Sequence, residues 1–147
     1  FSGYGEDQGY SYPTPAIARR AVFKEAPFEV WGSGHQGRDF VHIDDVLDCI
    51  EVAMEKIHDG TAINIGQGVL TSFRELIALF CEFADYKPEI KPLLDKPVGV
   101  HSRYCDMTWV KENLGWEPKI SIKEGMRRVY DAVIVREKQL GNINPLT

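Results

Sequence analysis

The chain has 147 residues, of which 44% are hydrophobic and 27% charged, as expected for one globular domain with its own core. A formal net charge of −5 disfavours a nucleic-acid-binding protein, because such proteins need a basic surface. No apolar run approaches the roughly 20 residues that cross a bilayer and no signal peptide is visible, so we expect no membrane association and a cytoplasmic protein.

The three cysteines are Cys49, Cys81 and Cys105, which are far apart in the chain and form no CxxC pair. An odd number of widely spaced cysteines disfavours both a disulfide framework and a zinc site. None of the four histidines has the HExxH spacing of a metal ligand. We therefore expect three small buried thiols, a reducing compartment and no metal site.

The first third of the chain predicts a loop, a helix and two strands. Residues 1–14 are rich in Gly, Tyr and Pro, which is typical of an irregular segment. Pro15 suits the first turn of a helix, and a helix is predicted from Ala16 to Lys24. Phe28–Trp31 alternates like a strand, and Asp39–Ile43 predicts a second one.

The middle of the chain predicts two amphipathic helices around one short strand. Asp44 and Asp45 are N-cap candidates for the first helix. Its apolar stripe comprises Val46, Cys49, Ile50, Ala53 and Ile57. Ala62–Ile65 predicts a short strand, and Ser72 with Glu75 forms a capping box that opens an apolar helix.

The last third predicts one strand and two helices. Glu89–Leu94 is a weaker strand candidate, and Met107–Asn113 predicts a short helix. Ser121 and Glu124 match a second capping box, which opens a helix from Ile122 to about Leu140. The mixed order of helices and short strands predicts an α/β protein, with a frayed polar tail after it.

The segment from Val30 to Phe40 holds the best candidate for a ligand site. Its three glycines allow the backbone to approach a ligand closely. Trp31 offers a flat apolar face, and Arg38 offers a planar charged fork that suits phosphate. Spacing alone favours the plainer interpretation, a glycine hairpin with Arg38 in a surface salt bridge.

The evidence for other ligand-binding residues in the sequence is weaker. Arg19, Arg20 and Arg103 are further anion-binding candidates, although a solvated surface is the usual place for each. Gly32-Ser33-Gly34 is no dinucleotide fingerprint, because the third glycine is missing and a strand follows where a helix should open. Residue chemistry alone thus predicts a small α/β domain with a candidate phosphate site.

The order of motifs resembles one protein family. Residues 30–46 are similar to the "vWGdGxxxRDFvyVdDva" block of the NAD-dependent epimerase/dehydratase family, the extended short-chain dehydrogenases/reductases (SDRs), which act on nucleotide sugars. Further blocks resemble its "NxYGP" (from Ser2), "NiGxG" (64–68), "sixEla" (72–76), "LGWxP" (114–118) and "leeGlrxtyxw" (122–130) motifs. Within the family, the motifs of this chain are most similar to those of enzymes that act on GDP-sugars.

The resemblance implies a fold and a function. The chain would be the C-terminal substrate-binding part of an extended SDR, a single domain over residues 1–147 from which the N-terminal Rossmann portion is absent. One helix-strand unit, from about Asp44 to Gly66, would belong to the Rossmann sheet. The implied function is binding of a nucleotide-diphosphate sugar, without activity alone. The alternative is a stand-alone nucleotide-binding or degenerate structural module.

The resemblance also implies a role for each of five site residues. Trp31 and Arg38 match positions that contact the nucleotide diphosphate. Arg103 matches a basic residue that grips the same phosphates, and Arg20 matches an arginine that reaches the nucleotide. Ser2 stands where the family has an asparagine that contacts substrate.

Catalytic and cofactor residues of the family have no counterpart in the sequence. Members carry a Gly-rich Rossmann turn and a Tyr-xxx-Lys pair, in which Tyr acts as acid and base and Lys lowers its pKa. None of the six tyrosines here has a lysine four residues later. We expect no cofactor on this chain and NAD or NADP on a full-length parent, with either a homodimer or the missing Rossmann domain as protein partner.

Overall fold

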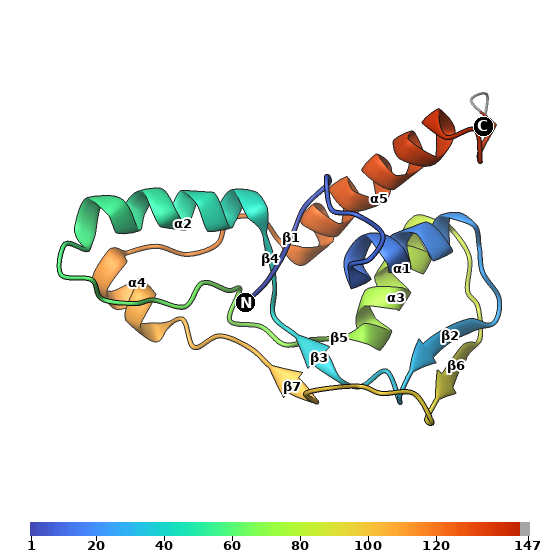
Figure 1. The fold of residues 1–147 in the computed structure, drawn as a ribbon, viewed down its shortest axis with the longest axis horizontal. Helices are drawn as coiled ribbons and strands as arrows, with labels where there is room; N and C mark the ends of the chain where they lie inside the picture. Colours follow the sequence, from blue (N-terminus) through green and yellow to red (C-terminus); the bar gives the residue numbers. More distant parts are fainter. Residues whose placement is uncertain (145–147) are drawn as a thin grey trace.

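The computed structural model describes residues 1–144, and within them five helices and seven short strands form an elongated molecule (Figure 1). The helices are α1 (Pro13–Val22), α2 (Ile43–Lys56), α3 (Phe73–Phe83), α4 (Thr108–Leu114) and α5 (Ile122–Gln139). The strands are β1 (Ser2–Tyr4), β2 (Phe28–Trp31), β3 (Gly37–Arg38), β4 (Phe40–His42), β5 (Thr71–Ser72), β6 (Ile90–Leu93) and β7 (Ser102–Arg103). The predicted α/β class is confirmed; the tail predicted after the last helix lies partly outside the described residues.

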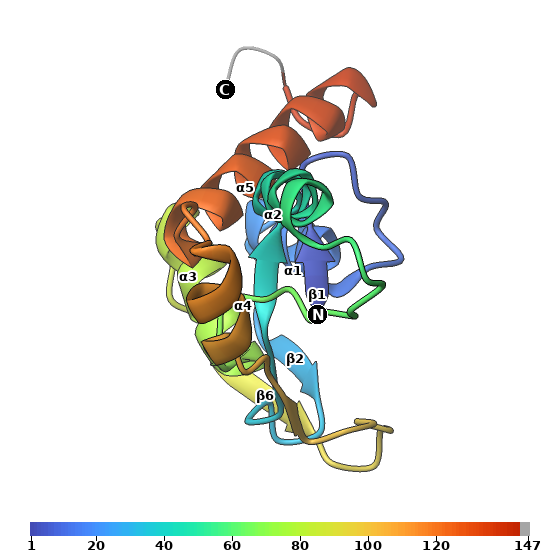
Figure 2. The ribbon, with the colours of Figure 1, turned by 90° about the vertical axis from the view of Figure 1, so that its left-hand side faces the viewer.

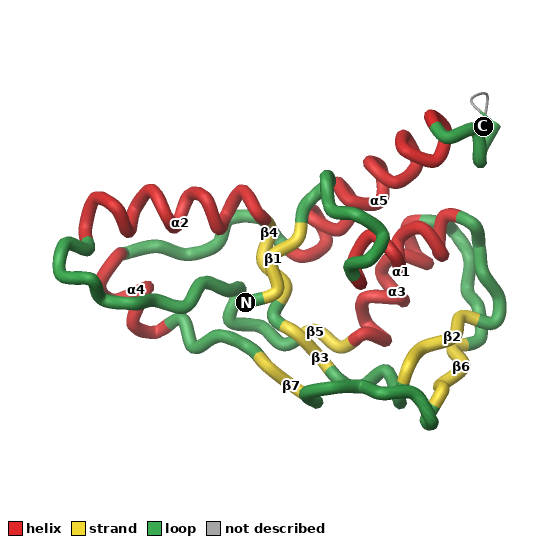
Figure 3. Tube along the Cα trace, in the orientation of Figure 1, coloured by secondary structure: helices red, strands yellow, loops and turns green. Residues whose placement is uncertain are grey.

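Three small sheets run along the molecule (Figure 3). β1 pairs with β4 and β2 with β6, both in parallel. In the third sheet, β3 lies between an antiparallel β5 and a parallel β7. Within residues 1–144, no helix is long and apolar enough to cross a membrane.

The core is divided into two clusters of buried side chains. The larger cluster joins α1, α3 and α5 to the central strands. The smaller cluster lies between α2 and α4, at the other end of the molecule (Figures 1 and 2). Hydrophobic spacing predicted both α3 and α5: Phe80 and Val133 are completely or almost completely buried. The capping box of Ser72 and Glu75 is formed as predicted.

The N-cap predicted for α2 is wrong. β4 runs directly into the helix, so His42 is the N-cap, and its Nδ1 accepts a hydrogen bond of 3.2 Å from the amide of Asp44. Asp44 is exposed. Asp45 is buried and accepts hydrogen bonds from the amides of Lys119 and Ile120, so it holds the end of the loop that leads into α5.

The strand predicted at Ala62–Ile65 is also absent, and these residues form an irregular segment. A strand needs a neighbour to satisfy its backbone groups, and among residues 1–144 no strand pairs with this segment, although the N-terminal amino group of Phe1 donates to the carbonyl oxygen of Ile65. Conversely, β1 lies where a loop was predicted, because Ser2, Gly3 and Tyr4 find a partner in β4. β3, β5 and β7 are two-residue strands, too short to show a period in the sequence.

The apolar stripe predicted for α2 is largely covered within the chain. Cys49 is fully buried, and Ala53 and Ile57 pack against residues of α4 and the segments around it. The exposed apolar side chains of α2 lie on a neighbouring face of the helix, which shares only Ile50 with the predicted stripe. We call its four side chains the α2 stripe: Ile43, Leu47, Ile50 and Met54.

Two arginines hold α1 and the loop that precedes it against α5. Glu137 of α5 is fully buried and accepts a hydrogen bond of 2.8 Å from Nε of Arg19. This bond lowers the pKa of Glu137 to about 2. Nearby, Arg136 donates to the carbonyl oxygens of Glu6 and Gln8. α1 and its entry loop are therefore held against α5.

A second buried carboxylate, Asp39, joins three segments of the chain. It is fully buried between β3 and β4. Its Oδ1 accepts the amide of Gln67 at 2.7 Å, and its Oδ2 accepts the amides of Gly68 and Cys105 at 2.9 and 3.0 Å. Hydrogen bonds from three N–H groups can compensate for the free energy that the carboxylate loses when it is removed from water.

Asp39→Asn tests this anchor. The amide of asparagine places an NH2 group where the carboxylate now accepts hydrogen bonds, so donors would face donors in a buried site. We expect a loss of about 3 kcal/mol in the free energy of unfolding. Urea unfolding followed by circular dichroism measures it. The exposed Asp7→Asn should be neutral, and equal stability of the two variants would contradict the role of Asp39.

Candidate functional site

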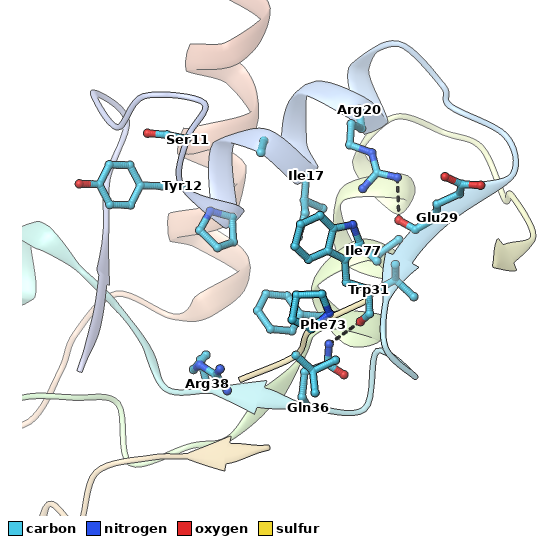
Figure 4. A pocket seen from close by; sticks show the side chains of 15 residues that line it. Ser11, Tyr12, Ile17, Arg20, Glu29, Trp31, Gln36, Arg38, Phe73 and Ile77 are labelled. Carbon is cyan, nitrogen blue, oxygen red and sulfur yellow. Dashed lines mark hydrogen bonds between the residues drawn. The ribbon is translucent and has the colours of Figure 1, made fainter. Parts of the chain in front are cut away.

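Two adjoining pockets lie between α1 and the small sheets. The indole pocket has a volume of about 390 Å³ and is lined by Arg20, Trp31 and mostly apolar side chains (Figure 4). The arginine pocket has a volume of about 380 Å³, and its lining includes Ser2, Arg38 and Arg103. The two share the lining residues Tyr12, Pro13, Arg38 and Phe73. All five residues singled out in the sequence therefore line one pair of pockets.

A glycine loop over residues 32–36 leads from the first pocket to the second. Gly32 and Gly34 have φ angles of +67° and +78°, which favour glycine. A Cβ on Gly32 would lie 2.1 Å from Cγ1 of Val98, so a side chain there would displace the segment that borders the indole pocket. Arg74 of α3 donates to the carbonyl oxygen of Ser33 at 2.7 Å, which holds the loop in place.

Arg38 and Arg103 are direct register partners on the parallel strands β3 and β7. Arg38 donates to the carbonyl oxygen of Gly37, and its guanidinium lies 6.0 Å from the ring centroid of Phe73. Arg103 lies 5.8 Å from the ring centroid of Phe1. Among residues 1–144, neither arginine has a carboxylate oxygen within 4 Å. The surface salt bridge that spacing alone favoured for Arg38 does not form there.

Arg20 is in a different electrostatic state. It projects from the last turn of α1, and its Nε and Nη2 donate to the two carboxylate oxygens of Glu25 at 2.8 and 2.6 Å. Nη2 also donates to the carbonyl oxygen of Glu29 at 2.7 Å. The guanidinium carbon lies 4.1 Å from the ring centroid of Phe28. Arg20 is thus oriented and neutralised inside the chain.

Trp31 and Ser2 lie on opposite sides of the shared lining. Trp31 is 57% exposed, and Figure 4 shows its indole extending into the pocket between Ile17 and Phe73. Its carbonyl oxygen accepts a hydrogen bond of 2.6 Å from Gln36. Ser2 lies in β1 and lines the arginine pocket. The site therefore combines an apolar, aromatic half with a cationic, polar half.

Sequence reasoning missed three residues of this site. Tyr12 and Phe73 line both pockets, and Gln36 orients the backbone of Trp31. Tyr12 and Phe73 come from segments interpreted only for their local structure, whereas Gln36 lies inside the candidate segment and was not singled out. A signal for Gln36 existed, because it is a polar side chain inside the glycine loop, but nothing local distinguishes it from an exposed turn residue.

The glycine loop over residues 32–36 does not have the arrangement that binds a dinucleotide pyrophosphate. A cofactor pyrophosphate needs a glycine turn that leads from a strand into a helix N-terminus. Here the glycine loop leads into β3. Residues 1–144 also contain no group of three His, Cys, Asp or Glu side chains that could hold a metal ion.

The sequence is similar to enzymes of nucleotide-sugar metabolism. A sequence model described as GDP-mannose 4,6 dehydratase matches residues 1–129. A putative GDP-L-fucose synthase 2 of Arabidopsis thaliana is 32% identical and aligns with 92% of this chain and 44% of its own length. GDP-mannose 3,5-epimerase of the same plant is 31% identical, over 97% of this chain and 38% of its own.

The fold is similar to solved structures of the same kind. UDP-glucose 4-epimerase from Thermotoga maritima, solved with UDP-glucose, superposes with a TM-score of 0.77 at 33% identity, over 94% of this chain and 44% of that one. The chain thus spans less than half the length of these relatives, in agreement with the expected C-terminal part of an extended SDR. The chain belongs to the NAD-dependent epimerase/dehydratase family of nucleotide-sugar enzymes, the extended SDRs.

Proposed function

We propose that this chain is the nucleotide-sugar-binding portion of an NAD(P)-dependent epimerase, dehydratase or reductase, with Arg38 and Arg103 holding the diphosphate. The observation that carries the proposal is that the two arginines are neighbours on paired strands and that neither has a carboxylate partner among residues 1–144. Two guanidinium groups at neighbouring positions repel each other, and an anion between them removes that repulsion. A diphosphate also accepts the forked hydrogen bonds that arginine donates.

The two pockets suggest how the rest of the ligand lies. The apolar indole pocket suits the base, because the exposed face of Trp31 offers a stacking surface. Arg38 lines both pockets, so the diphosphate would lie at their junction. The sugar would then extend into the arginine pocket towards Ser2. The lining of that pocket contains no acidic side chain.

The proposed chemistry belongs to a longer protein. The relatives are more than twice as long as the region they share with this chain. The lack of a Tyr-xxx-Lys pair and of a dinucleotide cradle supports a chain that binds substrate but is inactive alone, with NAD or NADP held by another portion. Three free cysteines support a cytoplasmic setting.

The alternative proposal is a stand-alone nucleotide-binding or degenerate structural module. It would share the fold but would not depend on a second domain. A coding region upstream of Phe1 with a Gly-rich turn and a Tyr-xxx-Lys pair would favour the enzyme portion. A start codon next to Phe1 would favour the module.

Calorimetry with GDP- and UDP-sugars tests the diphosphate site. The chain should bind weakly, and Arg38→Ala and Arg103→Ala should each cost about 1.5–3 kcal/mol of binding free energy, because a charge-assisted contact is lost. Arg127→Ala is the matched control, since it removes the same charge from an arginine of α5 paired with Asp131. The assignment is wrong if all three variants bind as the parent does.

Turnover assays test the proposed inactivity. The purified 147-residue chain, given a GDP- or UDP-sugar with NAD or NADP, should form no product, because it lacks the acid-base tyrosine and its lysine. Full-length UDP-glucose 4-epimerase from Thermotoga maritima, assayed in parallel with UDP-glucose, controls for the detection method. Measurable turnover that copurifies with the chain would overturn the proposal.

We also propose that the α2 stripe contacts an apolar partner, since four aligned side chains at 42–73% exposure form a contiguous patch. In a longer protein the partner would be the cofactor-binding portion; for the isolated chain it would be a second copy about a two-fold axis.

Sedimentation equilibrium tests whether the isolated chain forms this homodimer. The isolated chain should self-associate as its concentration rises, and Leu47→Glu should shift it towards the monomer by placing a charge in the patch. Val135→Glu makes the same change on an exposed site of α5 and should leave association unchanged. A parent that stays monomeric at every concentration would rule out the homodimer.

A further inference from the structure

Arg20 and the pair of Arg38 and Arg103 border the same site in different charge states. Arg20 is neutralised by Glu25, whereas the other two have no carboxylate partner among residues 1–144. A neutral ion pair attracts a phosphate far less than a free guanidinium does. The contrast indicates that these arginines recognise different parts of a ligand.

The hydrogen bonds of Arg20 leave one nitrogen unused. Nε and both hydrogens of Nη2 are directed to Glu25 and Glu29, so the two N–H groups of Nη1 have no acceptor among the described residues. The stacking contact with Phe28 fixes the plane of the guanidinium. In Figure 4 this group lies on the side of the indole pocket that carries Trp31.

We propose that Arg20 recognises the uncharged base through Nη1, that Glu25 is the positioning residue that holds it there, and that the pair is selective for guanine over uracil. This assignment rests on the proposed nucleotide-sugar binding. The pocket that Arg20 lines is apolar and aromatic, which suits a base better than a phosphate.

The choice of base follows from its acceptors. One edge of guanine carries two neighbouring acceptors, N7 and O6, and an arginine or lysine that binds both is the commonest base-specific contact in protein–DNA complexes. The corresponding edge of uracil carries only one acceptor, O4. Two N–H groups on Nη1 are therefore better satisfied by guanine. Glu25 stays ionised and paired at neutral pH, because the hydrogen bond from Arg20 lowers its pKa.

Calorimetry with GDP and UDP at two salt concentrations tests the assignment. The parent should bind GDP more tightly than UDP. Arg20→Lys keeps the charge, but its single nitrogen would pair with Glu25 and leave no second nitrogen for the base, so it should weaken GDP binding about tenfold with little effect on UDP or on the salt dependence. Arg38→Ala should weaken both nucleotides equally and reduce the salt dependence, because it removes a contact to phosphate.

Glu25→Gln separates positioning from a general effect on folding. It leaves Arg20 charged and unpaired, so the preference for GDP should fall while the salt dependence rises. A purely structural role would change the affinity for both nucleotides by the same factor. An unchanged GDP-to-UDP ratio in both Arg20→Lys and Glu25→Gln overturns only this assignment, whereas a parent that binds neither nucleotide overturns the proposed function as well.

Discussion

The carboxylate of Asp39 is the interaction on which the site depends. It lies beside Arg38 in the sequence, and its own amide donates to the carbonyl oxygen of Arg103 at 3.1 Å. Its side chain meanwhile holds the amides of residues 67, 68 and 105. These bonds bring β7 alongside β3, although the two strands are more than sixty residues apart in the chain. The juxtaposition of Arg38 and Arg103 follows from this buried anchor.

The arginines of the molecule have separate tasks because their partners differ. Arg19 is matched to the buried Glu137, and this pair holds α1 against α5. Arg20 is matched to Glu25 within the same helix-loop segment. Arg38 and Arg103 are left without a match among the described residues. The net charge of the chain therefore does not predict such a site. The chain is acidic overall, yet Arg38 and Arg103 place two positive charges side by side.

Division of the core into two clusters explains why one helix keeps an exposed apolar face. α2 packs against α4 and the segments around it through Cys49 and its neighbours, and the other side of the helix turns away from the rest of the chain (Figure 2). The segment 62–65, which follows α2, pairs with no strand within the described residues. The two features lie in the same helix-loop unit, and both are surfaces that the proposed apolar partner of α2 would cover.

Local sequence determined the helices, their apolar faces and the identity of the family. The capping box of Ser72 and Glu75 and the spacing of α5 depend only on residues a few positions apart, so a linear pattern contains them. Tertiary structure alone decided the N-cap of α2, the loss of the predicted strand and the partners of each arginine. Whether Arg20 is neutralised or Arg38 is free depends on which carboxylate folding brings within 4 Å, and the strength of a charge interaction is set by that distance and by burial. No pattern along the chain records either quantity.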